Sequence, residues 1–222
     1  MRKLILCEGK HDSIFFKKLF PKIKIPVSEV RFYDQETRAK LKDLRDAETK
    51  ELRKFSGDYS PYKILVKSEA GKNKAIDIFS RYLSYCIGKQ RKDIEKTILM
   101  LDLDNREFKR NRLGEDRLKK NTFEKTLDEL DDRIKNSRIG DPVYIEREII
   151  KKTDSIYLIK NNLKNEKNKK QIGNSFYFIL FVYSLEGEAN IHSSDDVNSI
   201  ENKISLFVGK TDTQSIFSLL FN

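Results

Sequence analysis

Two short apolar runs in the sequence each end abruptly at acidic residues. Residues 4–7 are followed by Glu8-Gly9-Lys10-His11-Asp12, and residues 97–101 are followed by Asp102-Leu103-Asp104. Short continuous apolar runs are typical of strands buried inside a parallel sheet. Ligands of open α/β sheets bind beyond the carboxyl ends of such strands. The sequence therefore predicts an acidic ligand site at one edge of an α/β sheet.

The pattern of the first 140 residues alternates between strands and helices. We predict strands at 62–67 and 96–102, and between them an amphipathic helix that carries Ala75, Ile76, Phe79 and Leu83. Repeated βαβ units imply a Rossmann-like core, in which helices flank a mostly parallel sheet. We expect this core to span residues 1–140, with a helical insertion at about 29–62.

Residues 141–222 are expected to extend the same domain by a strand and helices. Residues 176–185 are the most apolar stretch of the chain and suit a strand in the sheet interior. Residues 144–162 and 195–206 are predicted to be helical, and the apolar residues 216–221 are expected to dock onto the core.

The acidic residues form a candidate metal site. Asp102 and Asp104 are two positions apart on an extended segment, so both side chains project from the same side. Together with Glu8 they would repel one another unless a cation neutralised them, and Mg²⁺ (or Mn²⁺) prefers oxygen ligands of this kind. Asp12 suits either a helix N-cap or a further carboxylate facing the metal.

In this order and at strand ends, Glu8-Gly9-Lys10-His11-Asp12 and Asp102-x-Asp104 resemble the Toprim domain. That domain is shared by topoisomerases, bacterial primases, RNA maturation nucleases and OLD-family nucleases, and the resemblance covers about residues 1–110. It implies catalytic roles for Glu8, Asp102 and Asp104, and a metal-facing role for Asp12. The ninety or so residues between Glu8 and Asp102 exceed the compact Toprim pattern, which is why we place an insertion at 29–62.

A second group of residues suits phosphate binding. Gly71-Lys72-x-Lys74 lies between a predicted strand and a helix N-terminus, where free amides and ammonium groups favour an anion. Lys10 lies in the turn after the first strand, and Arg106, Arg110 and Arg112 belong to a basic strip at 106–120. His11, Glu186 and Glu188 are further candidates for the site.

Charge and composition restrict the class of protein. Forty-five Lys and Arg residues against thirty-five Asp and Glu give a formal net charge of +10, which favours a polyanionic partner such as DNA or RNA. A Lys-rich surface whose charges largely pair with one another is the alternative. The longest apolar run is about half of what a bilayer span needs. Two cysteines provide no disulfide framework, and Met1-Arg2-Lys3 leads straight into a core strand. We therefore expect a cytoplasmic protein without a membrane partner, and leave open whether it is a monomer or a homodimer.

These observations lead to one main functional hypothesis and two alternatives. The main hypothesis is Mg²⁺-dependent phosphodiester chemistry on nucleic acid, most simply hydrolysis by a nuclease. A non-catalytic Toprim-like adaptor that binds nucleic acid or a nucleotide would keep the basic surface without the metal. A nucleotide-binding enzyme of small-molecule metabolism would fit if Gly71-Lys72, rather than the acidic cluster, were the centre of the site.

Overall fold

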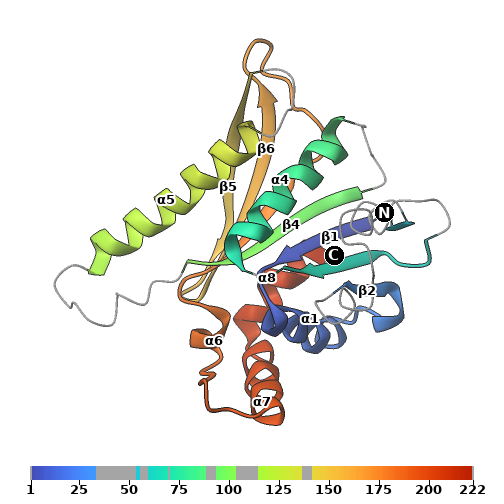
Figure 1. Cartoon of the computed structure of the whole chain (residues 1–222), viewed down its shortest axis with the longest axis vertical. Coiled ribbons are helices and arrows are strands. Elements are labelled where there is room, and N and C mark those ends of the chain that lie inside the picture. The colour runs from blue at the N-terminus through green and yellow to red at the C-terminus, as the bar shows by residue number, and fades with distance from the viewer. Residues whose placement is uncertain are drawn as a thin grey trace.

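A seven-stranded sheet with the strand order β2-β3-β1-β4-β7-β6-β5 forms the centre of the molecule (Figure 1). The structure is a computed structural model that describes residues 2–33, 54–55, 60–69, 71–88, 94–103, 115–136 and 142–221. The strands are β1 (Arg2–Cys7), β2 (Val30–Tyr33), β3 (Ile64–Ser68), β4 (Ile94–Asp102), β5 (Val143–Lys152), β6 (Ile156–Asn165) and β7 (Phe176–Phe181). The helices are α1 (Lys10–Lys22), the 3-10 turn η1 (Val27–Glu29), α4 (Lys72–Gly88), α5 (Glu115–Lys135), α6 (Leu185–Glu188), α7 (Val197–Val208) and α8 (Thr211–Phe221).

The first five strands in the spatial order are parallel, and only β6 runs against them. This is the predicted α/β class, a mostly parallel sheet flanked by helices. The interior strand β1 is apolar on both faces, and Leu4, Ile5, Leu6 and Cys7 are all fully buried. Such two-sided burial is what a strand covered by helices on both sides requires.

Two apolar layers hold the helices to the sheet. On one face, Leu4, Leu6 and Leu99 belong to the cluster that packs against α4 and α5. On the other face, Ile5 and Ile98 belong to the cluster that packs against α1, α7 and α8. Successive residues of a strand point to opposite faces, so each strand contributes to both layers.

Two expectations are corrected by the structure. Residues 144–162, predicted to be helical, instead form most of the antiparallel hairpin of β5 and β6. The range 29–62, assigned to a helical insertion, begins with the sheet strand β2, and its residues 34–53 and 56–59 lie outside the described part. The strand predicted at 176–185 ends at Phe181, and Leu185 begins helix α6.

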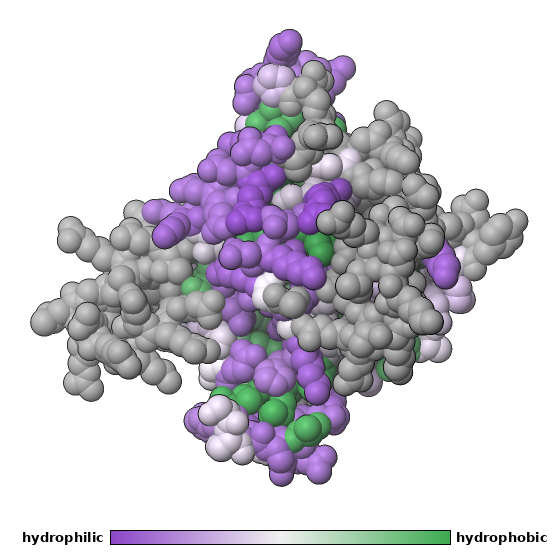
Figure 2. Space-filling view, viewed as in Figure 1, coloured by the Kyte–Doolittle hydropathy of each residue, from purple (hydrophilic) through white to green (hydrophobic). Residues whose placement is uncertain are grey.

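Other expectations for the C-terminal part are confirmed. Helix α7 begins after Asp196, whose carboxylate accepts a hydrogen bond from the Ser199 amide at 2.7 Å. Helix α8 docks its apolar side into the core through Ile216, Phe217 and Leu220. Among the described residues, no helix has both the length and the apolar character needed to cross a membrane. Hydrophilic residues dominate the described surface seen in Figure 2, and apolar residues gather mainly at its base.

Candidate functional site

Four of the acidic residues predicted from the sequence, Glu8, Asp12, Asp102 and Glu186, meet at the carboxyl edge of the sheet. Strands β1, β4 and β7 are parallel neighbours, and each is followed by a segment that carries an acidic residue toward this edge. A cavity of about 330 Å³ opens there. Its lining residues are Glu8, Gly9, His11, Asp12, Glu69, Gly71, Asp102 and Glu186.

Asp102 connects the segments around this cavity. Its amide donates to Glu8 Oε1 at 2.7 Å, and its own carboxylate accepts from the Leu185 amide at 3.1 Å. Its carbonyl oxygen accepts a hydrogen bond from Lys72 Nζ at 2.6 Å. One residue at the end of β4 therefore contacts the residue after β1 and the first residues of α4 and α6, which fixes the position of its carboxylate.

The sequence left open whether Asp12 is a helix N-cap or a carboxylate that faces the site. Helix α1 begins at Lys10 after the N-cap residue Gly9, so Asp12 is the third residue of the helix rather than the cap. Its carboxylate accepts from the Gly9 amide at 2.9 Å, which satisfies one of the free amides at the helix start. The same carboxylate lines the cavity, so its helix-stabilising role and its site role coexist.

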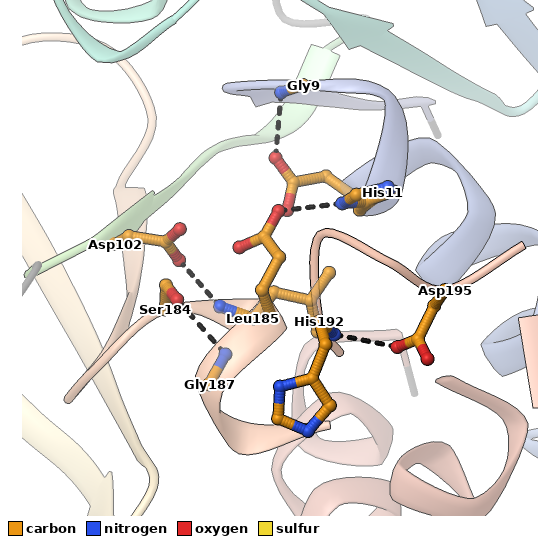
Figure 3. A network of polar contacts seen from close by, with 10 residues as sticks. Gly9, His11, Asp102, Ser184, Leu185, Gly187, His192 and Asp195 are labelled. Atoms are coloured by element: carbon orange, nitrogen blue, oxygen red, sulfur yellow. Dashed lines mark hydrogen bonds and ion pairs between the residues drawn. The ribbon is translucent and has the colours of Figure 1, made fainter. Parts of the chain in front are cut away.

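His11 and Glu186 close the remaining side of the cavity. Nδ1 of His11 lies 2.8 Å from Oε1 of Glu186, so α1 and α6 are joined across the site. Figure 3 shows this contact beside the Gly9 bond to the α1 carboxylate and the Asp102 bond to Leu185. Glu186 therefore belongs to the cavity, whereas Glu188 does not line it and accepts instead from the Ser155 hydroxyl at 2.5 Å.

The Gly71-Lys72 turn and the acidic cluster form one site rather than two. Gly71 has a φ of +99°, a conformation that favours glycine, and its amide donates to the Glu8 carbonyl at 2.9 Å. Lys72 begins α4 and reaches over to Asp102. Lys10 and Lys74 are exposed on the first turns of α1 and α4. A ligand held by the carboxylates would therefore lie next to the N-terminus of α4 and its lysine.

Two residues of this region were not predicted from the sequence. Glu69 lines the cavity yet is completely buried, and it forms an ion pair with Lys67, whose side chain is 2% exposed. The Lys67 ammonium group also lies 5.5 Å from the ring centroid of Tyr33. Charged residues at the end of an apolar strand, here Lys67-Ser68-Glu69, are the signal that could have identified the pair.

The carboxylates of the cavity strongly influence one another. Burial, reinforced by the charges of neighbouring carboxylates, raises the pKa of Asp102 to about 9. Burial and the charges of Glu8 and Glu186 raise the pKa of Asp12 to about 8, against the lowering effect of its backbone hydrogen bonds. The site therefore holds more negative groups than its hydrogen-bond donors can stabilise in ionised form.

The donor chemistry of the cavity fits a hard cation. Its oxygens come from carboxylates, which Mg²⁺ prefers, and their mutual repulsion is what a cation relieves. Among the cavity carboxylates, Glu8, Asp12, Asp102 and Glu186 could contribute ligands, whereas Glu69 is already paired with Lys67. In the arrangement that the structure describes, no three His, Cys, Asp or Glu side chains are already grouped to hold an ion. Asp104 lies outside the described residues, as do Arg106, Arg110 and Arg112.

Comparison with known proteins adds no assignment. Scans of the chain against protein-family models, curated proteins and solved structures find no match.

Proposed function

We propose that the protein carries out Mg²⁺-dependent phosphodiester chemistry on nucleic acid, most simply hydrolysis. One observation carries the proposal. Four carboxylates at the ends of three parallel strands line one cavity, namely those of Glu8, Asp12, Asp102 and Glu186. The raised pKa values of Asp12 and Asp102 support it, because a divalent cation would keep both groups ionised. The resemblance of the Glu8 and Asp102 segments to the Toprim domain points to the same chemistry.

Each residue of the cavity has a distinct role in this proposal. Asp12, Asp102 and Glu186 would hold the ion, and the ion supplies charge neutralisation and lowers the pKa of bound water. Glu8 would accept the proton of the attacking water as the new P–O bond forms and one P–O ester bond breaks, and would then pass this proton to the leaving oxygen. Gly71, just before α4, lines the same cavity, and Lys72 binds the carbonyl of Asp102, so the start of α4 would hold a phosphate oxygen.

A metal-free binding module is the second candidate. It is favoured by the absence, among the described residues, of a ready group of three metal-binding side chains. In that case Asp12 and Asp102 would be protonated near neutral pH, as their raised pKa values allow. The two candidates therefore differ in whether a divalent cation binds at this cavity.

Calorimetric titration with Mg²⁺ and Mn²⁺ separates them. Wild type should bind the ion, and Asp102→Asn should weaken binding by about tenfold or more, since one charged ligand is lost. Glu188→Gln is the matched control, because Glu188 is also a half-buried α6 carboxylate but lies outside the cavity. Equal affinity in wild type and Asp102→Asn would place the metal elsewhere, and no binding by wild type would favour the binding module.

A cleavage assay then tests the reaction itself. Labelled single- and double-stranded DNA and RNA are incubated with wild type and with Glu8→Gln, in Mg²⁺ and in Mn²⁺. Glu8→Gln keeps the size of the side chain and its ability to accept from Asp102, but it cannot take a proton. We expect cleavage to fall by about 10²-fold or more while nucleic-acid binding is retained. Equal rates for both proteins would assign the activity to a different site.

A further inference from the structure

A second and larger cavity lies at the amino edge of the sheet. Its volume is about 530 Å³, within the range of small-molecule sites. It is bounded by the start of β1, the end of α1, the segments that precede β2 and β3, and the end of α8. Lys3 Nζ approaches the Phe221 carbonyl at 3.5 Å, which joins two of these walls.

The charges around this cavity are strongly unbalanced. Lys3, Lys22, Lys24 and Lys63 line it, against one carboxylate, that of Glu29. Glu29 is already bound to Lys63 at 2.7 Å. With the described residues, Lys22 and Lys24 form no ion pair or hydrogen bond through their ammonium groups. Two cations are therefore left to attract an anion.

The backbone at Lys24 gives further support. Helix α1 ends in a Schellman motif, in which Ile25 donates to the Phe20 carbonyl at 2.8 Å and Lys24 donates to the Pro21 carbonyl at 3.3 Å. Lys24 occupies its left-handed position with a φ of 62°, where glycine is preferred. A side chain at this position costs stability, and Lys22 already places a cation at the helix end. Lys169 has a similar φ of 59° away from the cavity, so this strain supports a site at Lys24 only together with the lysines around the cavity.

The remaining walls are largely apolar. Ile23, Ile25, Pro26 and Phe221 contribute side chains beside the lysines. A molecule with a charged phosphate chain and a flat organic part would use both kinds of surface. We propose that this cavity binds a small polyphosphate ligand of the nucleotide class, with Lys22 and Lys24 as its phosphate contacts.

This inference does not depend on the proposed function. The six residues of β1 separate the two cavities, which is about 20 Å at 3.3 Å per residue. The new site therefore lies beyond direct contact with Glu8 and Asp102. Binding can be measured in EDTA, so that no divalent ion carries a nucleotide to the acidic cavity.

The variant Lys24→Gly is expected to raise stability while it lowers ligand affinity. It should raise Tm by about 2 °C, because the left-handed strain is relieved. It should also weaken ATP binding about tenfold, because one charge-assisted contact is lost. Lys169→Gly is the matched control, since Lys169 has a φ of 59° but does not line the cavity. The control should leave ATP affinity unchanged, and it should gain less stability, because it also loses the contact between the Lys169 ammonium group and the Tyr144 ring at 4.9 Å.

The ligands are ATP, tripolyphosphate, adenosine and a single-stranded oligonucleotide, titrated by calorimetry at low salt and in EDTA. ATP binding that weakens in Lys24→Gly, and weakens further in Lys22→Ala/Lys24→Gly, supports the proposal. Equal binding of tripolyphosphate and ATP overturns the nucleotide part of the proposal, because it assigns recognition to the phosphate chain alone. The proposal is overturned if wild type binds neither compound, if adenosine alone binds, if only the oligonucleotide binds, or if both single glycine variants bind ATP like wild type.

Discussion

The two edges of the sheet carry opposite charge. At the carboxyl edge, Glu8, Asp12, Asp102 and Glu186 surround a cavity next to the N-termini of α1 and α4. At the amino edge, four lysines surround a cavity next to the C-termini of α1 and α8. Helix N-termini favour negative groups and helix C-termini favour positive ones, so the direction of the helices sets the sign at each edge. At each edge, the charged residues of one sign outnumber the two helix ends that could stabilise them. A ligand of opposite charge would balance this excess at each edge.

The largest expected effect concerns the buried ion pair at the acidic edge. Lys67→Met would leave Glu69 buried without its cation, and we expect a loss of about 3–5 kcal/mol in the free energy of unfolding. Unfolding by denaturant measures this change in the free energy of unfolding. The double variant Lys67→Met/Glu69→Gln should recover most of the loss, because no uncompensated charge remains. A small loss in the single variant would mean that the buried ion pair contributes little to stability.

An exposed pair serves as the comparison. Lys164 binds Glu146 at 2.7 Å on the surface of the β5–β6 hairpin. Lys164→Met should change stability little, because water screens and solvates both groups. Similar losses in the free energy of unfolding for Lys67→Met and Lys164→Met would mean that burial does not determine how much an ion pair contributes to stability.

The next effect is a pH dependence of stability that arises at the acidic edge. The folded protein raises the pKa of Asp12 to about 8 and of Asp102 to about 9, above the unfolded value of 3.8. The folded state therefore binds more protons than the unfolded state between about pH 4 and pH 9, so metal-free stability falls as pH rises through this window. We expect a lower Tm at pH 8.5 than at pH 5.5 in EDTA.

Asp102→Asn sharpens this prediction. The variant should be more stable than wild type by about 1 kcal/mol or more at pH 8.5, and its Tm should vary less with pH. Asn can still accept the hydrogen bond from Leu185, so local structure is retained. An identical pH profile in the two proteins would mean that Asp102 does not titrate in this range.

The smallest effect compares two left-handed residues, one at each edge. Gly71→Ala should lower stability by about 1 kcal/mol, because its φ of +99° strains any side chain although no atom lies within 4 Å of an added Cβ. Lys24→Gly should shift stability in the opposite direction. Gly71→Asn, whose side chain tolerates this region better, should lose less than Gly71→Ala. Equal Tm values for wild type and Gly71→Ala would show that the turn relaxes without cost.

The core of the fold follows from the sequence because its strands are buried on both faces. Residues 4–7 and 97–101 are continuous apolar runs, and the structure places both at the sheet centre. The β5–β6 hairpin was missed because β5 is the outermost strand and most of its side chains are at least partly exposed. The strand conformation of β5 depends on its pairing with β6, and such pairing is difficult to predict from the local sequence.

The residues of the site that directly follow apolar strands were predictable from the sequence. Glu8 and Asp102 meet as expected, because parallel neighbours end at the same edge. Glu186 could be named only as a candidate, because strand order determines which later segment reaches the edge. Glu69 was missed because its role depends on a cation two residues earlier that is itself buried.

The placement of α8 has a consequence for how the chain acquires its structure. Phe217 and Leu220 cover the same face of the sheet as Ile5 and Phe15, and Lys3 reaches the Phe221 carbonyl across 218 positions of sequence. During synthesis this face has no cover from α7 and α8 until residues 197–221 have left the ribosome. Contacts of such long sequence separation slow folding. We therefore expect nascent chains that end before α8 to expose apolar surface and to need protection from aggregation.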